Sequence, residues 1–120
     1  MLTRYVFFEG EALTDMARFC SDIGDQLLPL WRDMPHNTGV RLTFADSRDA
    51  DAPPILMVLA VDYPDEAALQ ASLDSPHRFL TRDRSAVLLA RLFRGRVHHH
   101  VTRALAPASG SPTQPEPIGI

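Results

Sequence analysis

Three consecutive histidines, His98-His99-His100, are the residues whose type and spacing point most directly to chemistry. An imidazole titrates near neutral pH, so it can act as an acid, a base or a metal ligand. Val97 and Val101 flank the triplet and predict a β-strand, in which successive side chains point to opposite faces. His99 should therefore share an apolar, helix-facing side with the two valines, while His98 and His100 share the other side.

The histidine triplet has three open interpretations. His98 and His100 could chelate a transition metal from one strand face, but no nearby acid or cysteine offers a third ligand, so we predict no metal. His99 could be an acid or base in an apolar pocket, where loss of hydration favours the neutral imidazole. The histidines could also be polar strand residues that form hydrogen bonds within a subunit interface.

Another histidine, His77, stands beside Pro76 at the predicted start of a helix. It is a second candidate catalytic residue at the mouth of a pocket, with simple exposure to solvent as the alternative. His36 falls in a predicted loop and is expected to be solvated.

Aromatic residues supply candidate walls for a ligand pocket around His99. Trp31 ends the apolar stripe of the first predicted helix, and Phe79 is expected on the inner side of the last one. The first strand contributes either Tyr5 or Phe8, because its sequence does not settle which face each residue occupies. A titratable group between apolar walls is typical of a small-molecule site, so these four aromatic residues are predicted to bind a ligand.

The composition is that of an ordinary globular domain, with 45% hydrophobic and 22% charged residues in a chain of 120. A net charge of -3 gives no sign of the basic surface that nucleic-acid binding needs. Cys20 is the single cysteine, so an intrachain disulfide is excluded and a cytoplasmic location is expected. The absence of a long apolar run predicts no membrane association. No phosphate-binding loop or flavin fingerprint occurs, so no cofactor is predicted.

Apolar periodicity predicts strands over residues 2–9, 40–44, 55–61 and 96–105, with Gly10 ending the first strand and 46–54 forming a loop. A helix is predicted from residue 12 to residue 31, with a kink or break between 24 and 28 because Pro29 cannot donate a helical hydrogen bond. The positions expected to face the core on this helix are Leu13, Met16, Ala17, Cys20, Ile23, Gly24, Leu27 and Trp31.

A second helical region should begin near Asp65 and continue through Leu73. Ser75 and Pro76 then form a new helix start, with the serine as cap and the proline in the first turn. Gly95 is expected to end this last helix. The residues predicted to face inward on it are Phe79, Leu80, Val87, Leu88 and Leu92.

The order β-α-β followed by β-α-β predicts a ferredoxin-like α+β sandwich. We expect a four-stranded antiparallel sheet in the order 4-1-3-2, with the helices on one face. Residues 55–61 are apolar at every position, which indicates cover on both sheet faces and hence a homodimer formed by the bare faces. Arg41 is the charged residue expected on the bare side. Residues 1–105 form the domain, and the Pro/Ser-rich tail 106–120 packs against a partner subunit or a crystal neighbour.

The segments Tyr63 to Leu69 and Leu73 to Arg78, with Asp83 beyond them, resemble the dimeric α+β barrel superfamily and most closely its EthD-like branch. In that branch the second helix ends near a short Ser-Pro or Asp-Pro step, with an acid several residues later. The resemblance implies a homodimer whose sheets face each other as a barrel, with a pocket between sheet and helices. It also implies small, often aromatic or polyketide-like ligands. Relatives include cofactor-free monooxygenases, cyclases, isomerases and decarboxylases, and the cyclases carry a first-strand histidine that residues 5–8 lack.

Two functions follow from these expectations. The first is an enzyme without a bound cofactor that acts on a small apolar or aromatic metabolite, with His99 and His77 as acid-base groups. The second is a non-catalytic ligand-binding or structural homodimer in which the histidines serve the interface. A deep cavity that contains His99 would favour the first function.

Overall fold

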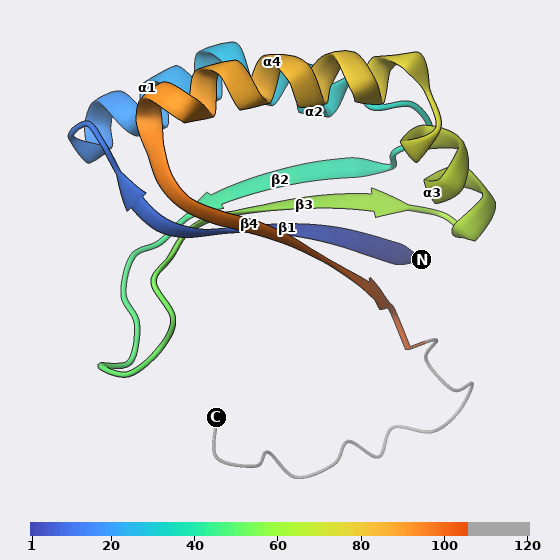
Figure 1. Ribbon diagram of the computed structural model, residues 1–120. Coiled ribbons are helices and arrows are strands. Elements are labelled where there is room, and N and C mark those ends of the chain that lie inside the picture. The colour runs from blue at the N-terminus through green and yellow to red at the C-terminus, as the bar shows by residue number, and fades with distance from the viewer. Residues whose placement is uncertain (106–120) are drawn as a thin grey trace, which may run out of the picture.

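The computed structural model describes residues 1–105 and shows a twisted sheet with helices over one of its faces (Figure 1). The predictions made for the 106–120 tail lie outside the described residues. The elements in chain order are β1 (Leu2–Ala12), α1 (Met16–Gln26), α2 (Leu28–Arg32), β2 (Gly39–Phe44), β3 (Ile55–Tyr63), α3 (Glu66–Leu73), α4 (Pro76–Leu92) and β4 (Phe93–Arg103).

The four strands form one antiparallel sheet in the order β2-β3-β1-β4. The predicted ferredoxin-like fold and its strand order are therefore confirmed. Figure 1 shows α1, α2 and α4 above the sheet, α3 at one end, and the β2–β3 loop reaching away from the helices on the other side. We call the side of the sheet without helices the open face.

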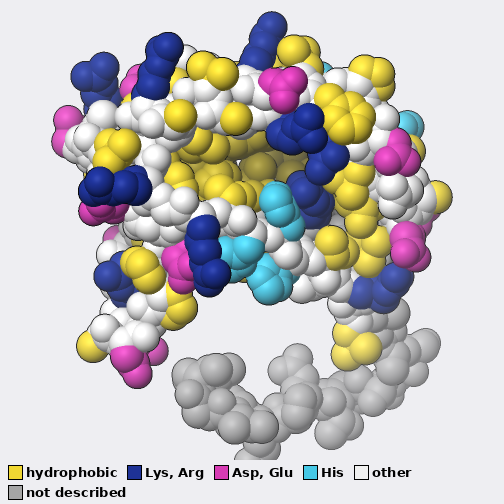
Figure 2. Space-filling model, in the orientation of Figure 1, with side chains coloured by type: hydrophobic (Ala, Val, Ile, Leu, Met, Phe, Trp, Pro, Cys, Tyr) yellow, Lys and Arg dark blue, Asp and Glu magenta, His cyan; other side chains and the backbone are white. Residues whose placement is uncertain are grey.

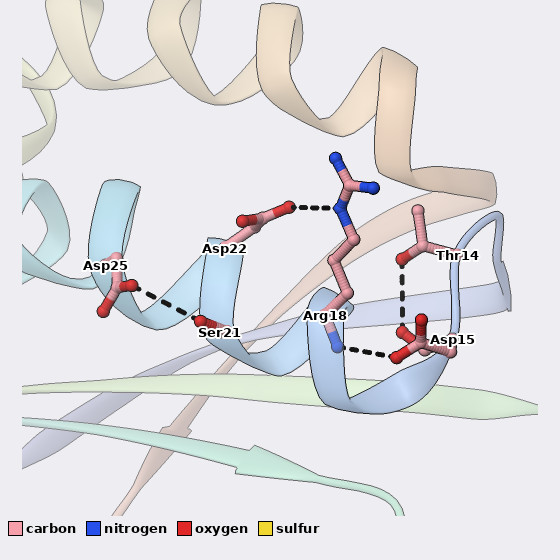
Figure 3. A network of polar contacts seen from close by, with 6 residues as sticks. All are labelled: Thr14, Asp15, Arg18, Ser21, Asp22 and Asp25. Carbon is pink, nitrogen blue, oxygen red and sulfur yellow. Dashed lines mark hydrogen bonds and ion pairs between the residues drawn. The ribbon is translucent and has the colours of Figure 1, made fainter.

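Side-chain caps start the three longer helices, and the predicted cap Ser75 is confirmed, whereas the first helix begins at Met16 and not at residue 12 as predicted. The Asp15 carboxylate accepts a hydrogen bond from the Arg18 backbone N–H at 2.9 Å, and a line of polar contacts continues along the outer side of α1 (Figure 3). Asp65 caps α3 and Ser75 caps α4 in the same way. The predicted break in the first helix is confirmed, because α1 ends at Gln26 and α2 begins at Leu28, just before Pro29.

The buried face of the first helix is narrower than predicted. Ile23, Leu27 and Trp31 are buried as expected, and Phe19, which the periodicity analysis missed, is fully buried beside them. The residues expected further towards the N-terminus are not part of this face, since Leu13 and Met16 are exposed and Cys20 is half-buried. The predicted apolar stripe was therefore displaced around the helix axis. It included residues at the side of the buried face and left out Phe19 at the centre of that face.

Two glycines join β1 and β4 at a close crossing. Gly10 pairs with Gly95 across the ladder, and both have a positive φ, 154° and 158°, that other residues rarely adopt. A Cβ built on Gly10 would lie 2.1 Å from the Arg94 carbonyl oxygen. The prediction that these glycines end the first strand and the last helix is wrong, because β1 continues to Ala12 and β4 begins at Phe93.

The inner face of α4 also differs from the prediction. Phe79, Leu80 and Val87 are exposed rather than inward-facing, and the Phe79 ring lies under the guanidinium groups of neighbouring arginines. The side chains buried on this helix are Thr81, Ser85 and Leu92. The sequence prediction assumed that the largest apolar residues mark the inner face, but small hydroxyl side chains occupy much of it.

Candidate functional site

A cavity of about 290 Å³ lies between the helix-facing side of the sheet and helices α2 and α4. Figure 2 shows a hollow beneath the helices, with hydrophobic side chains inside it and arginine and histidine side chains at its edge. This volume is at the lower end of the range for pockets that take small organic molecules. The residues that line it are Arg4, Val6, Phe8, Trp31, Met34, Leu59, Val61, Tyr63, Arg78, Thr81, Arg82, Ser85, Ala86, Leu89, Val97 and His99.

Strand parity builds the floor of the cavity. Arg4, Val6 and Phe8 alternate along β1, so their side chains share the helix-facing side. Residues four apart on a strand have Cα atoms about 13 Å apart, so Arg4 and Phe8 mark two ends of the site. The cavity therefore has a charged end and an aromatic end on one continuous strand.

Trp31 forms the aromatic end together with Phe8. The two ring centroids are 6.2 Å apart, and both side chains are buried. Trp31 reaches this position because α2 begins a new helix after Leu27 and brings its last turn over the sheet. Of the residues predicted to bind ligand, Trp31 and Phe8 thus line the same cavity.

His99 lies opposite Val6 on β4 and lines the rim of the cavity. Its side chain is exposed, so it stands at the entrance rather than between two apolar walls. Partial burial lowers the pKa of His99 below its usual value, and the positive charges of Arg4 and Arg78 lower it further. The neutral imidazole, which can accept a proton, is therefore favoured at neutral pH.

Two arginines form the charged end. Arg4 comes from β1 and Arg78 from the first turn of α4, and both side chains are half-buried. Burial lowers the pKa of Arg4, and repulsion from the Arg78 guanidinium lowers it further. Within residues 1–105 neither arginine forms an ion pair, and no Asp or Glu lines the cavity.

Two hydroxyl side chains of α4 complete the wall. Thr81 and Ser85 are one helical turn apart and are only 4% and 9% exposed. Their oxygens are shielded from solvent and have no hydrogen-bond partner among the described residues. Buried hydroxyls are normally paired, so these two groups call for an explanation.

Other residues predicted for the site lie elsewhere. Tyr5 is on the open face, where its ring stacks on Phe7 with centroids 5.8 Å apart. The His77 Nε2 lies 2.9 Å from the Leu30 carbonyl oxygen, so this histidine links the start of α4 to α2 and does not line the cavity. Phe79 is outside the cavity as well. Of the two options for the first strand, parity selects Phe8.

The remaining histidines of the triplet lie on the open face, as predicted. His98 stacks on Phe7 at 5.3 Å between centroids, and its Nδ1 is 3.1 Å from the Nε2 of His100. Among the residues that the structure describes, no third histidine, cysteine or acid joins them in a metal-binding group. The prediction of no metal remains one for metal analysis to test.

The open face also carries a polar network that the sequence analysis found only in part. Arg41 lies on this face as expected and forms an ion pair with Asp62. The Thr3 hydroxyl donates a hydrogen bond to the same carboxylate at 2.7 Å. These contacts hold the pKa of the Asp62 carboxyl below its usual value, with the Arg41 hydrogen bond as the largest cause.

Sequence reasoning missed five polar residues of the cavity wall: Arg4, Arg78, Thr81, Arg82 and Ser85. Leu2, Arg4, Val6 and Phe8 alternate along one face of the strand, and a charged residue on that otherwise apolar face was a usable signal. Thr81 and Ser85 follow Arg78 at helical spacing, but a search for large apolar residues passes over them. A second depression of about 630 Å³ lies between α1 and α2 on one side and α4 on the other, with no histidine or cysteine in its wall.

Comparison with known proteins shows the fold. No protein-family model matches the chain, and no curated protein matches its sequence. A solved EthD family protein from Bacillus halodurans aligns with a TM-score of 0.69 and 12% identity, over 88% of this chain and 100% of that one. A dimeric ferredoxin-like protein of unknown function from Thermobifida fusca aligns at 0.62 and 14%, over 86% and 90%.

The cofactor-independent oxygenase SnoaB from Streptomyces nogalater aligns with a TM-score of 0.54 and 19% identity, over 89% of this chain and 95% of that one. The chain therefore shares the fold of these solved structures, which agrees with the expected resemblance to the dimeric α+β barrel proteins. Among the described residues, no helix has the length and apolar character needed to cross a bilayer.

Proposed function

We propose that the protein binds a small apolar or aromatic metabolite in the cavity under α4 and acts on it without a bound cofactor. The observation that carries this proposal is a cavity with an aromatic end, a charged end and a histidine at its rim. Trp31 and Phe8 offer flat apolar surface to an aromatic ring and exclude water from it.

His99 is the proposed acid-base group. Its lowered pKa favours a neutral ring, and a neutral ring can remove a proton from an acidic carbon or hydroxyl group of a ligand. Such a proton removal is a first step that monooxygenase, cyclase and isomerase chemistry on polyketide-like compounds can share. A solved structure with the same fold is a cofactor-independent oxygenase, which supports a reaction of this class.

We also propose a homodimer in which two open faces meet. Phe7, Tyr5 and His98 form an aromatic stack on that face, and a second sheet would cover it. A solved structure with this fold is described as dimeric, which supports the assignment. Analytical ultracentrifugation at micromolar concentration should show a species of twice the chain mass, and a monomer would overturn the dimer. A cytoplasmic location remains part of the proposal.

The test of the main function combines binding with turnover. Aromatic and polyketide-like compounds are titrated into the protein while the emission of Trp31, the single tryptophan, is followed. Compounds that bind are then incubated in air without added cofactor and analysed for products. His99→Asn should abolish turnover and leave binding within a few-fold.

The matched control is His36→Asn. His36 is exposed on a loop and has a positive φ of 66°, a conformation that asparagine adopts readily. This variant should keep full turnover. Binding without turnover in the unmodified protein would favour the alternative, a non-catalytic ligand-binding homodimer. Failure of every compound to bind would leave only a structural role.

A further inference from the structure

The charge pattern of the cavity carries an inference about the ligand, which rests on the proposed binding function. We propose that the ligand is an aromatic carboxylate, bound as its anion with the carboxylate between Arg4 and Arg78. Its ring then lies along the floor towards Phe8 and Trp31.

Arg4 and Arg78 carry charge that no acid in the cavity wall compensates. Arg4 and Arg78 are half-buried and close enough for one to lower the pKa of the other. Like charges in a partly dehydrated site repel strongly when no counter-charge is present. An arginine remains protonated at any physiological pH, so this repulsion cannot be relieved by loss of a proton. A bound anion relieves it, and a planar guanidinium matches the two oxygens of a carboxylate.

Two unpartnered hydroxyl groups in the cavity wall also favour an anionic ligand. Thr81 and Ser85 follow Arg78 along the same inner face of α4, and each is more than nine-tenths buried. A hydroxyl can donate one hydrogen bond, and rotation about its Cα–Cβ bond turns that donor towards an acceptor in the cavity. A carboxylate offers about four acceptor sites, enough for guanidinium and hydroxyl donors together.

The charged end and the aromatic end of the cavity are well separated. Arg4 and Phe8 lie about 13 Å apart on one strand, with Val6 and the facing His99 between them. A ligand with an anionic head and an aromatic body fits that order of surfaces. A neutral aromatic compound would leave the charged end unpaired, and a cationic compound would meet arginine and histidine groups without any acid in the wall.

The experiment measures dissociation constants by calorimetry for three probes of one shape: 2-naphthoate, 2-naphthamide and 2-naphthylmethylammonium. Perturbation of the Trp31 indole resonance in NMR spectra checks that each probe enters the cavity. The carboxylate should bind at least about tenfold more tightly than the amide, since hydrogen bonds to a charged acceptor are stronger than those to a neutral one. The ammonium probe should bind most weakly.

Arg4→Gln and Arg78→Gln should each reduce the preference for carboxylate over amide to about threefold or less while the amide still binds. Removing one of two repelling charges should not unfold the protein, and circular dichroism verifies this. Arg84→Gln is the matched control, because it makes the same charge change on α4 at an exposed position outside the cavity wall. It should keep the full preference.

The outcomes separate the two proposals. Equal binding of amide and carboxylate, or a preference that survives both arginine variants, would overturn the carboxylate assignment and leave small-molecule binding in place. If none of the three probes binds, both the assignment and the proposed binding function are wrong.

Discussion

Replacing Ser85 by alanine should make the ligand-free protein more stable, which is the reverse of the usual effect of a buried substitution. Ser85 is 9% exposed, and its hydroxyl has no partner among the described residues. An unpaired buried hydroxyl costs roughly 1–3 kcal/mol, and alanine is a better helix former than serine by about 0.5 kcal/mol. The side chain already borders a cavity, so the loss of one oxygen creates little new void. We expect a net gain of at least about 1 kcal/mol.

Ser72 provides the matched comparison, because it is a fully buried serine on helix α3 that does have a partner. Its hydroxyl lies 2.8 Å from the Tyr63 hydroxyl, and both side chains are buried. Ser72→Ala gains the same helix propensity but leaves the phenol hydroxyl without that partner. We expect a net loss of about 1–2 kcal/mol. The two alanine variants should therefore differ by at least about 2 kcal/mol in opposite directions.

Urea denaturation at one fixed protein concentration measures both changes, and the same concentration is needed because a dimer would couple stability to it. For a domain of this size, about 1 kcal/mol corresponds to a shift of about 4–8 °C in Tm. A loss of stability in Ser85→Ala equal to that in Ser72→Ala would refute the reasoning. It would mean that the Ser85 hydroxyl is paired in solution, for instance with the carbonyl one turn earlier in α4.

Two further predictions concern the sheet. Gly10→Ala should destabilise the protein by more than about 3 kcal/mol, because the new methyl group would collide with backbone atoms of β4 and because alanine disfavours the positive φ of this position. A variant that melts within a few degrees of the unmodified protein would show that β1 and β4 cross less closely at Gly10 than described. Asp62 has a lowered pKa in the folded state, so its charged form contributes stability that is fully present above its ordinary pKa of 3.8 and is lost as pH falls through the lowered value. The unmodified protein should therefore have a higher free energy of unfolding than Asp62→Asn, by an amount that is constant between pH 5 and 7 and shrinks in acid. A difference that does not change with pH down to about 2 would contradict the assigned ion pair with Arg41.

The strand and helix order followed from local patterns in the chain. Alternation in β2, the apolar run 55–61 of β3, and the helix starts near Asp65 and at Ser75 depend on residues within one or two turns of each other, so no tertiary information was needed to find them. Parity on β4 alone assigned His99 to the helix-facing side and His98 to the open face. The ferredoxin-like plan then followed from the order of elements, because few topologies satisfy it.

The tertiary structure decided which residues share the site. Strand β1 has large side chains on both faces, so only its pairing register with β3 and β4 placed Arg4 and Phe8 in the cavity and Tyr5 outside it. The rotation of α4 about its axis depends on what it packs against, and this rotation turned Ser85 inward and Phe79 outward. Sequence periodicity reports only on residues that are close together in the chain. Arg4 and Arg78 are 74 positions apart, and only the folded chain brings them to the same cavity.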